Sequence, residues 1–595
     1  SSLWRRHRTT VTAAMPEHRR LRAPNEDGGV LLDPPAPEIS KLLAENAARW
    51  GGNDSVTGGD AAALQRYDVQ GCSLGELARL ARRELLSAAH RYSVSYGDVA
   101  ATPCAQSGGE IQANPLPSGD ATPLQSRPPR VATDSSISED VPTIISGHQP
   151  ELFHPGVWAK HFVADRLAST CRGVAINLLI DSDIVRGTTM RVPGGSVDRP
   201  FVESIPYDTP VEGIAYEEYC VRDRGALHSF GRRAGAVIAP LVPQSLVGSF
   251  WDRVIEASRQ TDQVGLCFAQ ARHRLERSFG LTTLELPQSY VCQMESFYWF
   301  TAHLLAHLPR FWDIYNSAVQ DFRCENRIRS TAHPVPDLAM DGEWLEAPFW
   351  LWDRQNPSRR RLFVRRAGDG LLLTDLDQWQ TRISISPDGD ASDAVMQLDA
   401  LARTGVKIRT RALVTTMFAR LFLADLFIHG IGGAKYDQVT DEIIRRFFDL
   451  RPPRYLTMST TLRLPTARVS VDEGECSRIS GQLHDLLWHP EVFLEKNSSS
   501  NDTSKWQPLI EKKRAWIATE QTPENARQRF REIRNCNANL QKWVEYEAQA
   551  LRRRREQLRE SARIESVLGS REYSFCLHPE ENLRELLLDN VGARL

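Results

Sequence analysis

Three polar loops carry the side chains of this chain that are best suited to chemistry, and the first begins with SGHQPELFHPGVWAK at Ser146. Gly147 permits a tight turn, while His148, Gln149 and Lys160 offer groups that bind phosphate or carboxylate. A histidine and a glutamine in such a loop also cap helices or bond the backbone without any catalytic role. We expect His148 and Lys160 to be catalytic, and Gly147 and Gln149 to bind the ligand.

The second loop follows the apolar run VAINLLI and carries the acidic sequence DSD. Acids that follow a buried strand commonly hold ribose hydroxyls, a substrate amine or a metal ion. We expect Asp181 to act in catalysis and Asp183 in binding. Asp183 equally fits the role of a turn residue, because aspartate side chains often bond the nearby backbone.

The third loop is HGIGGAKYDQVTD, which begins at His429. Two adjacent glycines followed by a lysine predict a backbone nest that holds an anion, and the aspartate after them predicts the cap of the next helix. The glycine before them, Gly430, predicts the end of the preceding helix. The spacing differs from that of a P-loop. The predicted binding residues of this loop are Gly432, Gly433, Lys435, Tyr436 and Asp437.

The elements around the first two loops predict a parallel sheet. PTIIS is short and β-branched, WAKHFVADRLAS places Trp158, Phe162 and Leu167 on one helical face, and VAINLLI is apolar throughout. A strand that is apolar on both faces belongs in a sheet covered by helices, so this stretch predicts a βαβ unit of a doubly wound α/β fold. Neighbouring parallel strands end at one edge, so the loops should share a crevice. WLEAPFWLWD, RLFVRR and GLLLTDL predict further strands of this sheet.

The remaining patterns are helical. ALVTTMFARLFLADLFIHG, residues 412–430, predicts a buried helix, since Arg420 and Asp425 interrupt it too strongly for a membrane span. Near the C-terminus, residues 525–564 are highly charged and have a sparse apolar seam. Such a polar helix needs a partner helix along its apolar seam. This pattern predicts an antiparallel coiled-coil hairpin or a homodimer. The seam residues are Leu540, Val544, Leu551 and Leu558.

These patterns divide the chain into predicted segments. Ser73 and Glu76 have the spacing of a capping box and mark a helix start in the N-terminal region. Pro, Ser, Gly and Thr dominate the stretch before the first polar loop, which is typical of a linker. We expect a disordered N-terminus (1–40), a helical segment (41–100), a linker (101–140), an α/β core (141–465) and a helical coiled-coil region (466–595).

Composition argues against several classes of protein. With 73 basic and 75 acidic residues among 595, the net charge of -2 provides no global field that would favour nucleic acid or an anionic membrane as a partner. The ten cysteines are scattered without a CxxC pair, which argues against a zinc knuckle and favours reduced thiols in the cytoplasm. GxSxG, HExxH and GxGxxG are absent, and we predict no protein ligands for a metal.

The three loops, in order, resemble elements of the cysteine ligases of bacillithiol biosynthesis, the BshC family. SGHQPELFHPGVWAKHFVADRLA is similar to the TGQQPGLFTGP element that opens the Rossmann-like domain of that family. LLIDSD falls where the family has an acidic EDHD-type element, and FIHGIGGAKYDQVTDEIIRRFF falls where a GPGE.AY segment opens a helix. SREYSFCLHPEENLREL corresponds to the closing LQERVLN region, so the resemblance covers residues 141–595.

The resemblance implies a Rossmann-like parallel sheet with added helices, a coiled coil that supports a homodimer, and a ligase. That ligase would join cysteine or another amino acid to the amine of a sugar-like acceptor such as glucosaminyl malate. Amide formation from a free carboxylate is uphill, which implies ATP or ADP in the site, with Mg²⁺. The chain departs from the family at three points: His148 replaces the first glutamine of GQQP, DSD lacks the histidine of EDHD, and Lys435 replaces an acid.

Under this hypothesis each loop has its own role. His148 and Lys160 would stabilise charge that develops on phosphate, Asp181 or Asp183 would orient an amine or a ribose, and the glycine loop with Lys435 would bind an anionic part of the substrate. Two other hypotheses stay open. Nucleotidyl or glycosyl transfer uses the same kind of crevice, because a histidine there serves a phosphate leaving group equally well. A non-catalytic scaffold would use the C-terminal helices to assemble partners.

Overall fold

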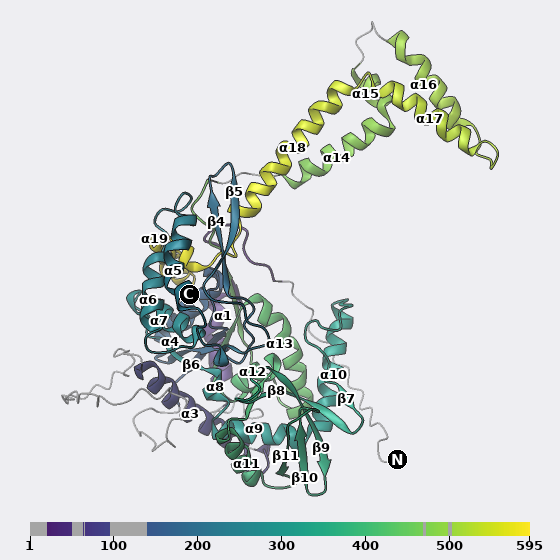
Figure 1. The fold of residues 1–595 in the computed structure, drawn as a ribbon. Helices are drawn as coiled ribbons and strands as arrows, with labels where there is room; N and C mark the ends of the chain where they lie inside the picture. Colours follow the sequence, from purple (N-terminus) through teal and green to yellow (C-terminus); the bar gives the residue numbers. More distant parts are fainter. Residues whose placement is uncertain (1–20, 50–63, 65, 96–139, 468–471, 498–502) are drawn as a thin grey trace.

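The computed structural model describes residues 21–49, 64, 66–95, 140–467, 472–497 and 503–595. Within these residues the chain is a mixed α/β protein with a mainly parallel sheet, an antiparallel sheet, a β-hairpin and a helical arm that projects from the body (Figure 1). The mainly parallel sheet carries the three polar loops, so its construction decides where they lie.

Five parallel strands form the centre of this sheet. Their spatial order is β14-β13-β2-β3-β6, and β1 (Val30–Asp33) pairs antiparallel with β14 at the edge. The parallel strands are β2 (Thr143–His148), β3 (Val174–Leu179), β6 (Leu284–Pro287), β13 (Leu426–His429) and β14 (Leu456–Thr460). The predicted α/β class is confirmed, as are parallel strands at PTIIS and VAINLLI.

Both faces of this sheet are buried. Ile144 packs in one hydrophobic core and its neighbour Ile145 packs in the other, as the alternation of side chains along a strand requires. We call the first the α4 core, after the helix α4 (Pro155–Cys171) that covers it. The α4 core also includes α5 (Arg224–Ile238), α6 (Val247–Ala257), α7 (Val264–Ser278), η2 (Tyr216–Glu218), β4 (Thr189–Gly195) and β5 (Pro200–Pro206).

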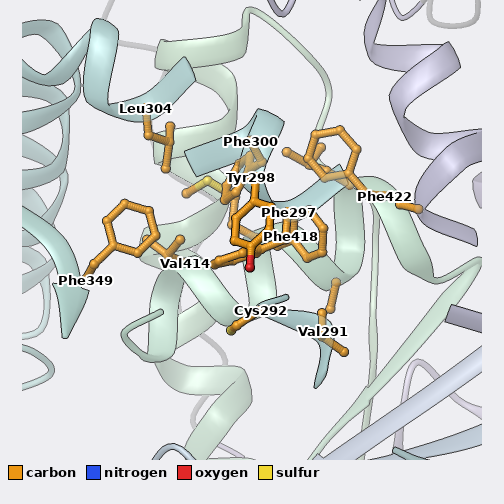
Figure 2. Packing of buried hydrophobic residues seen from close by; sticks show 14 of the residues in the cluster. Val291, Cys292, Phe297, Tyr298, Phe300, Leu304, Phe349, Val414, Phe418 and Phe422 are labelled. Atoms are coloured by element: carbon orange, nitrogen blue, oxygen red, sulfur yellow. The ribbon is translucent and has the colours of Figure 1, made fainter. Parts of the chain in front are cut away.

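The opposite face belongs to the α9 core, which is rich in aromatic rings (Figure 2). The ring centres of Phe297 and Phe300, on α9 (Glu295–Ala306), lie 5.4 and 5.1 Å from that of Phe418. These rings fill the space between the two larger sheets. Other helices that contribute to this core include α3 (Leu74–Ser95), α8 (Gln288–Val291), α10 (Leu308–Glu325), α11 (Ser392–Arg403), α13 (Ile431–Ile443) and η4 (Ile444–Phe448).

The strands predicted at WLEAPFWLWD, RLFVRR and GLLLTDL exist, but the prediction that they extend the parallel sheet is wrong. They form a separate antiparallel sheet, because short connections let consecutive strands pair antiparallel, whereas a parallel partner needs a long crossover. Its strands are β7 (Met340–Asp341), β8 (Trp344–Trp352), β9 (Arg360–Ala367), β10 (Gly370–Thr374), β11 (Gln380–Ser384) and β12 (Lys407–Thr410).

The segment 412–430, predicted as one buried helix, instead holds a helix and a central strand. Helix α12 (Ala412–Phe418) continues into a π-helical turn, η3 (Ala419–Leu423), and the chain then enters β13. Every residue of β13 is buried. A short sequence that is buried on all sides has no hydrophobic periodicity that would distinguish a strand from a buried helix. Gly430 does not end a helix, because it is the N-cap of α13.

Part of the stretch predicted to be disordered is ordered. Within residues 21–40 lie β1 and the start of α1 (Ala36–Ala47), so the prediction is wrong there. β1 is stabilised by its pairing with β14, a partner more than 400 residues away that local composition does not reveal. Residues 1–20 and all but the last residue of the predicted linker, 101–140, lie outside the described residues.

Helix α3 is anchored to the parallel sheet by a buried ion pair. The Arg82 guanidinium donates to both carboxylate oxygens of Asp425, at 2.9 and 2.8 Å. Asp425 directly precedes β13 and also accepts the backbone N–H of Thr143 in β2, at 2.7 Å. The predicted capping box at the start of α3 is confirmed, since Ser73 and Glu76 each accept the backbone N–H of the other.

The arm consists of five helices that run out from the body and back (Figure 1). Glu475 pairs with Arg554, and Leu486 packs in one cluster with Ala548, so α14 and α18 are antiparallel. The predicted seam residues Leu540, Val544, Leu551 and Leu558 are buried or half-buried. The helices are α14 (Glu473–Trp488), α15 (Pro490–Asn497), α16 (Thr503–Ala518), α17 (Ala526–Gln541) and α18 (Glu545–Leu568).

The last residues, assigned by sequence to the helical region, return to the body. The ring centre of Phe575 lies 4.6 Å from that of Trp158 on α4. Nε of Arg463 donates to the carbonyl oxygen of Gly569 at 3.0 Å, so the chain leaves and re-enters the body at adjoining points. This segment contains η5 (Phe575–Leu577), α19 (Glu580–Arg584), η6 (Glu585–Asn590) and η7 (Gly592–Arg594).

Candidate functional site

The three polar loops leave the same edge of the parallel sheet. β2 lies between β3 and β13, and all three strands are parallel. Gly147 pairs with Leu178 and Ser146 pairs with Ile428, so the strands end at the same level. Helix α4, which follows β2, packs on one face of the sheet, and α13, which follows β13, packs on the other. Open α/β sheets bind ligands where the chain switches faces in this way.

Lys160 and His148 both lie at the first loop but differ in exposure. Lys160, in the second turn of α4, is buried and donates a hydrogen bond of 2.7 Å to the carbonyl oxygen of Gly147. The His148 ring is edge-on to Phe153, with ring centres 5.2 Å apart, and Nδ1 is 3.8 Å from the Glu151 carboxylate. The His148 side chain is 24% exposed, so it presents an imidazole to solvent next to a buried amine.

Burial sets the charge of both groups. Together with the nearby Arg272 guanidinium, it lowers the pKa of Lys160 to about 7. Burial and the Lys160 amine hold the pKa of His148 well below its ordinary range. At neutral pH the His148 ring is therefore uncharged, and Lys160 is about half protonated. An anion that binds beside Lys160 raises its pKa, because the opposite charge favours the ammonium form.

Gln149 joins the first loop to the second. Its Nε2 donates to Oδ2 of Asp183 at 2.8 Å, and the Arg359 guanidinium donates to Oδ1 at 2.8 Å. The Arg359 guanidinium also lies 4.3 Å from the centre of the Trp350 ring, and that of Arg411 lies 4.2 Å from it. The structure thus brings the predicted binding residues Gln149 and Asp183 together and places two arginines near them.

Asp181 does not face the open edge. Its carboxylate accepts hydrogen bonds from both the backbone N–H and the hydroxyl of Ser289, at 2.9 and 2.5 Å, and the side chain is buried. Burial, together with the Glu217 carboxylate, raises the pKa of Asp181 to about 7. The side chain fixes the start of α8, so the expected contact of Asp181 with a substrate is not supported by its position. Sequence does not show the turn that directs it inward.

The third loop contains no nest, and the predicted conformation is wrong. Gly432 and Gly433 lie in the first turn of α13, after the N-cap Gly430. A Cβ added to Gly433 would lie 2.8 Å from Nδ1 of His429, whereas nothing lies within 4 Å of a Cβ added to Gly430 or Gly432. Gly433 therefore permits the close approach of His429, and the other two glycines leave the helix start open. No side-chain hydrogen bond caps this end of α13 within the described chain.

Asp437 lies inside α13, so its predicted role as the helix cap is wrong. Its carboxylate accepts a hydrogen bond of 2.6 Å from Arg420 and lies 2.8 Å from Nε2 of His429. Burial raises the pKa of Asp437, but the Arg420 guanidinium and the His429 ring outweigh it and hold the pKa well below the ordinary range. Lys435 is exposed on the outer side of α13, and Tyr436 is half-buried against the α9 core.

The start of α13 suits a phosphate. Free N–H groups at a helix N-terminus bind anions, and this end lies beside the loop that carries His148. The start of α4 offers fewer donors, because Pro155 has no N–H and Nδ1 of His154 accepts the N–H of Gly156 at 3.1 Å. The residues at this edge therefore fit the phosphate of a nucleotide at α13 rather than at α4.

The residues at this edge do not fit Mg²⁺ well. Both oxygens of Asp181 accept hydrogen bonds from Ser289, and those of Asp183 accept hydrogen bonds from Gln149 and Arg359. Mg²⁺ is bound through carboxylates that are free to face it. We derive no role for Mg²⁺ from these side chains, and its participation stays a prediction.

Arg359 and His429 are the residues at this edge that the sequence did not reveal as candidates. Arg359 precedes β9 of the antiparallel sheet, and nothing local indicates that it reaches Asp183. His429 is the last residue of the fully buried strand β13 and contacts Asp437. A polar residue that ends an apolar run is the signal that could have identified His429.

Comparison with known proteins adds no assignment. No family model matches the chain, and no curated protein matches it significantly. In the part of the chain that the structure describes, no helix combines the length and apolar character needed to cross a bilayer. The nine cysteines in that part are free thiols. The function is therefore inferred from the residues and their geometry.

Proposed function

We propose that this chain has a Rossmann-like core and is an amide-forming ligase of the cysteine-adding type of bacillithiol biosynthesis. It joins the carboxylate of cysteine or another amino acid to the amine of a sugar-like acceptor. ATP binds at the edge between β2 and β13 and supplies the phosphate that activates the carboxylate. The resemblance of the three loops to the BshC family supports the proposed reaction. The order of strands in the parallel sheet supports the proposed position of the binding site.

The observation that carries the proposal is the order of the parallel strands. Numbered along the chain, the order β6-β3-β2-β13-β14 is 3-2-1-4-5, which is the order of dinucleotide-binding sheets. In such sheets the ligand lies at the switch between strands 1 and 4, which here are β2 and β13. The open start of α13 and the partly exposed His148 lie at this switch.

The residues at the edge divide the work between binding and orientation. The N–H groups at the start of α13 bind phosphate, and Lys160 gains full positive charge once an anion is beside it. The Gln149 to Asp183 bond, supported by Arg359, holds the first two loops at a fixed separation. A neutral His148 offers a ring nitrogen as a hydrogen-bond acceptor that orients the attacking amine.

We expect the arm to provide the contact surface of a homodimer. Several large apolar side chains are exposed where α14 and α15 meet α17 and α18, which include Leu487, Trp488, Val492, Trp543 and Tyr546. Exposed apolar side chains that cluster in this way favour contact with another protein surface. A second copy of this chain is the partner that the proposal requires.

Isothermal titration calorimetry of the full chain with ADP tests the site. We expect Lys160→Met and Gly432→Ala to weaken ADP binding by on the order of 10-fold or more, since each changes the phosphate position. Gly481→Ala on α14 is the matched control, because a Cβ there also meets nothing within 4 Å and the arm is remote from the site. Its affinity should equal that of the unmodified chain.

Turnover then distinguishes the reaction. With ATP, cysteine and an amino-sugar acceptor, release of phosphate or pyrophosphate should require both the amino acid and the acceptor. Pyrophosphate release that is independent of the amino acid would instead favour nucleotidyl transfer. Absence of nucleotide binding would favour the scaffold hypothesis and contradict the ligase.

A further inference from the structure

Helix α7 and strand β6 bring three potential metal ligands together below the candidate site. His273 and Glu276 lie one turn apart on α7, and Glu285 lies on β6. Nδ1 of His273 is 4.0 Å from Oε2 of Glu276 and 3.9 Å from Oε2 of Glu285, and the three ligand atoms lie within 4.8 Å of one another. A point equidistant from atoms so spaced lies roughly 2.3–2.5 Å from each, close to the bond lengths of divalent cations.

Glu276 turns one oxygen to protein donors and the other to this point. Its Oε1 accepts a hydrogen bond of 2.6 Å from Nε1 of Trp158 and lies 2.6 Å from Nδ1 of His161. Its Oε2 accepts no hydrogen bond from the described residues, although the residue is only 1% exposed. A buried carboxylate oxygen without a donor is costly, so this atom indicates a missing ligand.

One oxygen of Glu285 is also held by protein donors. Its Oε1 accepts a hydrogen bond of 2.9 Å from Nδ2 of Asn177 and another from the Arg272 guanidinium. Its Oε2 is the atom that faces His273. Carboxylates that bind metal ions are commonly oriented by hydrogen bonds of this kind to one of their oxygens.

The charge of the cluster also favours a cation. Arg272 brings one positive charge to the two carboxylates, since its guanidinium pairs with Glu276 and with Glu285. All three side chains are at most 2% exposed. Two carboxylates brought together away from water repel each other, and this repulsion is costly. A divalent cation between the two Oε2 atoms reduces it.

We propose that His273, Glu276 and Glu285 bind a divalent first-row transition ion such as Zn²⁺. A site of one imidazole nitrogen and two carboxylate oxygens suits this class better than Mg²⁺ or Ca²⁺, which prefer oxygen alone. The site is closed to solvent, so the ion is structural and binds as the chain folds. It ties α7 to β6.

The ion supports the surface on which the first polar loop rests. The Arg272 guanidinium, which pairs with both metal-binding carboxylates, lies 5.4 Å from the centre of the Phe153 ring. The same ring is edge-on to His148. Loss of the ion therefore loosens the packing below His148 without removing any residue at the sheet edge.

Metal analysis of the purified full chain tests this proposal. Inductively coupled plasma mass spectrometry should find close to one transition ion per chain. After unfolding with a chelator and refolding with Co²⁺, visible absorption should show a bound ion, and the melting temperature should exceed that of protein refolded without metal. A chain that contains no transition ion and binds no Co²⁺ on refolding would overturn the proposal and leave an ion-pair cluster.

Two substitutions locate the ion. Glu276→Gln keeps the size of the side chain and an oxygen for Trp158 but removes a charged ligand, and His273→Gln removes the nitrogen. We expect each to weaken Co²⁺ binding on the order of 100-fold. His228→Gln, at an exposed histidine on α5, is the control and should bind Co²⁺ normally. Unchanged Co²⁺ affinity in either cluster variant, with a native circular dichroism spectrum, would contradict the assignment.

Discussion

Gln149 and Asp183, 34 residues apart in sequence, are joined by a hydrogen bond of 2.8 Å from Nε2 to Oδ2. This bond connects the loops that follow β2 and β3. Because Asp183 also accepts a hydrogen bond from Arg359, one carboxylate links two loops of the parallel sheet to the antiparallel sheet. This carboxylate therefore helps to fix the relative position of the two sheets at the candidate site.

Gln149→Leu should lower the free energy of unfolding by about 1 kcal/mol, because a partly buried hydrogen bond to a carboxylate is lost. A double-mutant cycle with Asp183→Asn should give a coupling energy of about 0.5–1.5 kcal/mol in urea unfolding. A coupling energy indistinguishable from zero would show that the contact does not hold the loops together.

Lys160 should make stability rise with pH above neutrality. Its pKa is about 7 in the folded chain and about 10.4 in the unfolded chain. Between these values the unfolded state binds more protons, so the free energy of unfolding increases by up to about 5 kcal/mol from this group as pH rises. Lys160→Met should remove the increase, and urea unfolding from about pH 7 to about pH 9 measures it. Parallel pH profiles of the two proteins would contradict the buried, weakly basic amine.

Asp425→Asn should lower the free energy of unfolding by about 3–5 kcal/mol, because it leaves the buried Arg82 guanidinium without its anion. Arg91→Met, at an exposed arginine on the same helix, is the control and should change the free energy by less than about 0.5 kcal/mol. Urea denaturation followed by circular dichroism gives both values. Equal effects of the two substitutions would mean that α3 is not anchored through this pair.

Gly433→Ala and Gly432→Ala should differ sharply although they are neighbours. A methyl group at Gly433 meets Nδ1 of His429 at 2.8 Å, so we expect a loss of about 1–3 kcal/mol from overpacking. At Gly432 the methyl group meets nothing within 4 Å, and alanine in a helix should be neutral or stabilise by up to about 1 kcal/mol. Thermal unfolding of the two variants compares them, and a stable Gly433→Ala protein would refute the close approach of His429.

The arm should control association. Replacing Trp488 and Tyr546 by serine together should convert a dimer into a monomer, measured by light scattering after size-exclusion chromatography. Met396→Ser on α11 exposes the same kind of apolar side chain on the body and should leave the dimer intact. A monomeric unmodified chain, or a dimer that survives the double substitution, would exclude assembly through this surface.

The hydrophobic pattern of neighbouring segments predicts the part of the candidate site that lies within one βαβ unit. Around Gly147 the strand, the loop and the helix follow each other directly in sequence, and their periodicities differ enough to separate them. Parallel pairing then places the next strand end, with Asp183, at the same edge. The capping box at Ser73 is predictable for the same reason, because its partner Glu76 is three residues away.

The rest depends on partners that are distant in sequence. Asp181 turns inward because Ser289, more than one hundred residues later, offers two donors. β13 resembles a helix until its neighbours β2 and β14 are known. The proposed metal-binding cluster is not visible in the sequence, because a histidine and a glutamate three residues apart are common on helices. Glu285, which completes the cluster, lies on the adjacent strand.

The contact between Arg463 and Gly569 closes a gap that the whole arm spans. Because the two ends of the arm touch, a tight turn can replace the arm without disturbing any strand of the body. A change in the length of the arm is therefore expected to alter the proposed assembly surface and to leave the polar loops at the sheet edge in place.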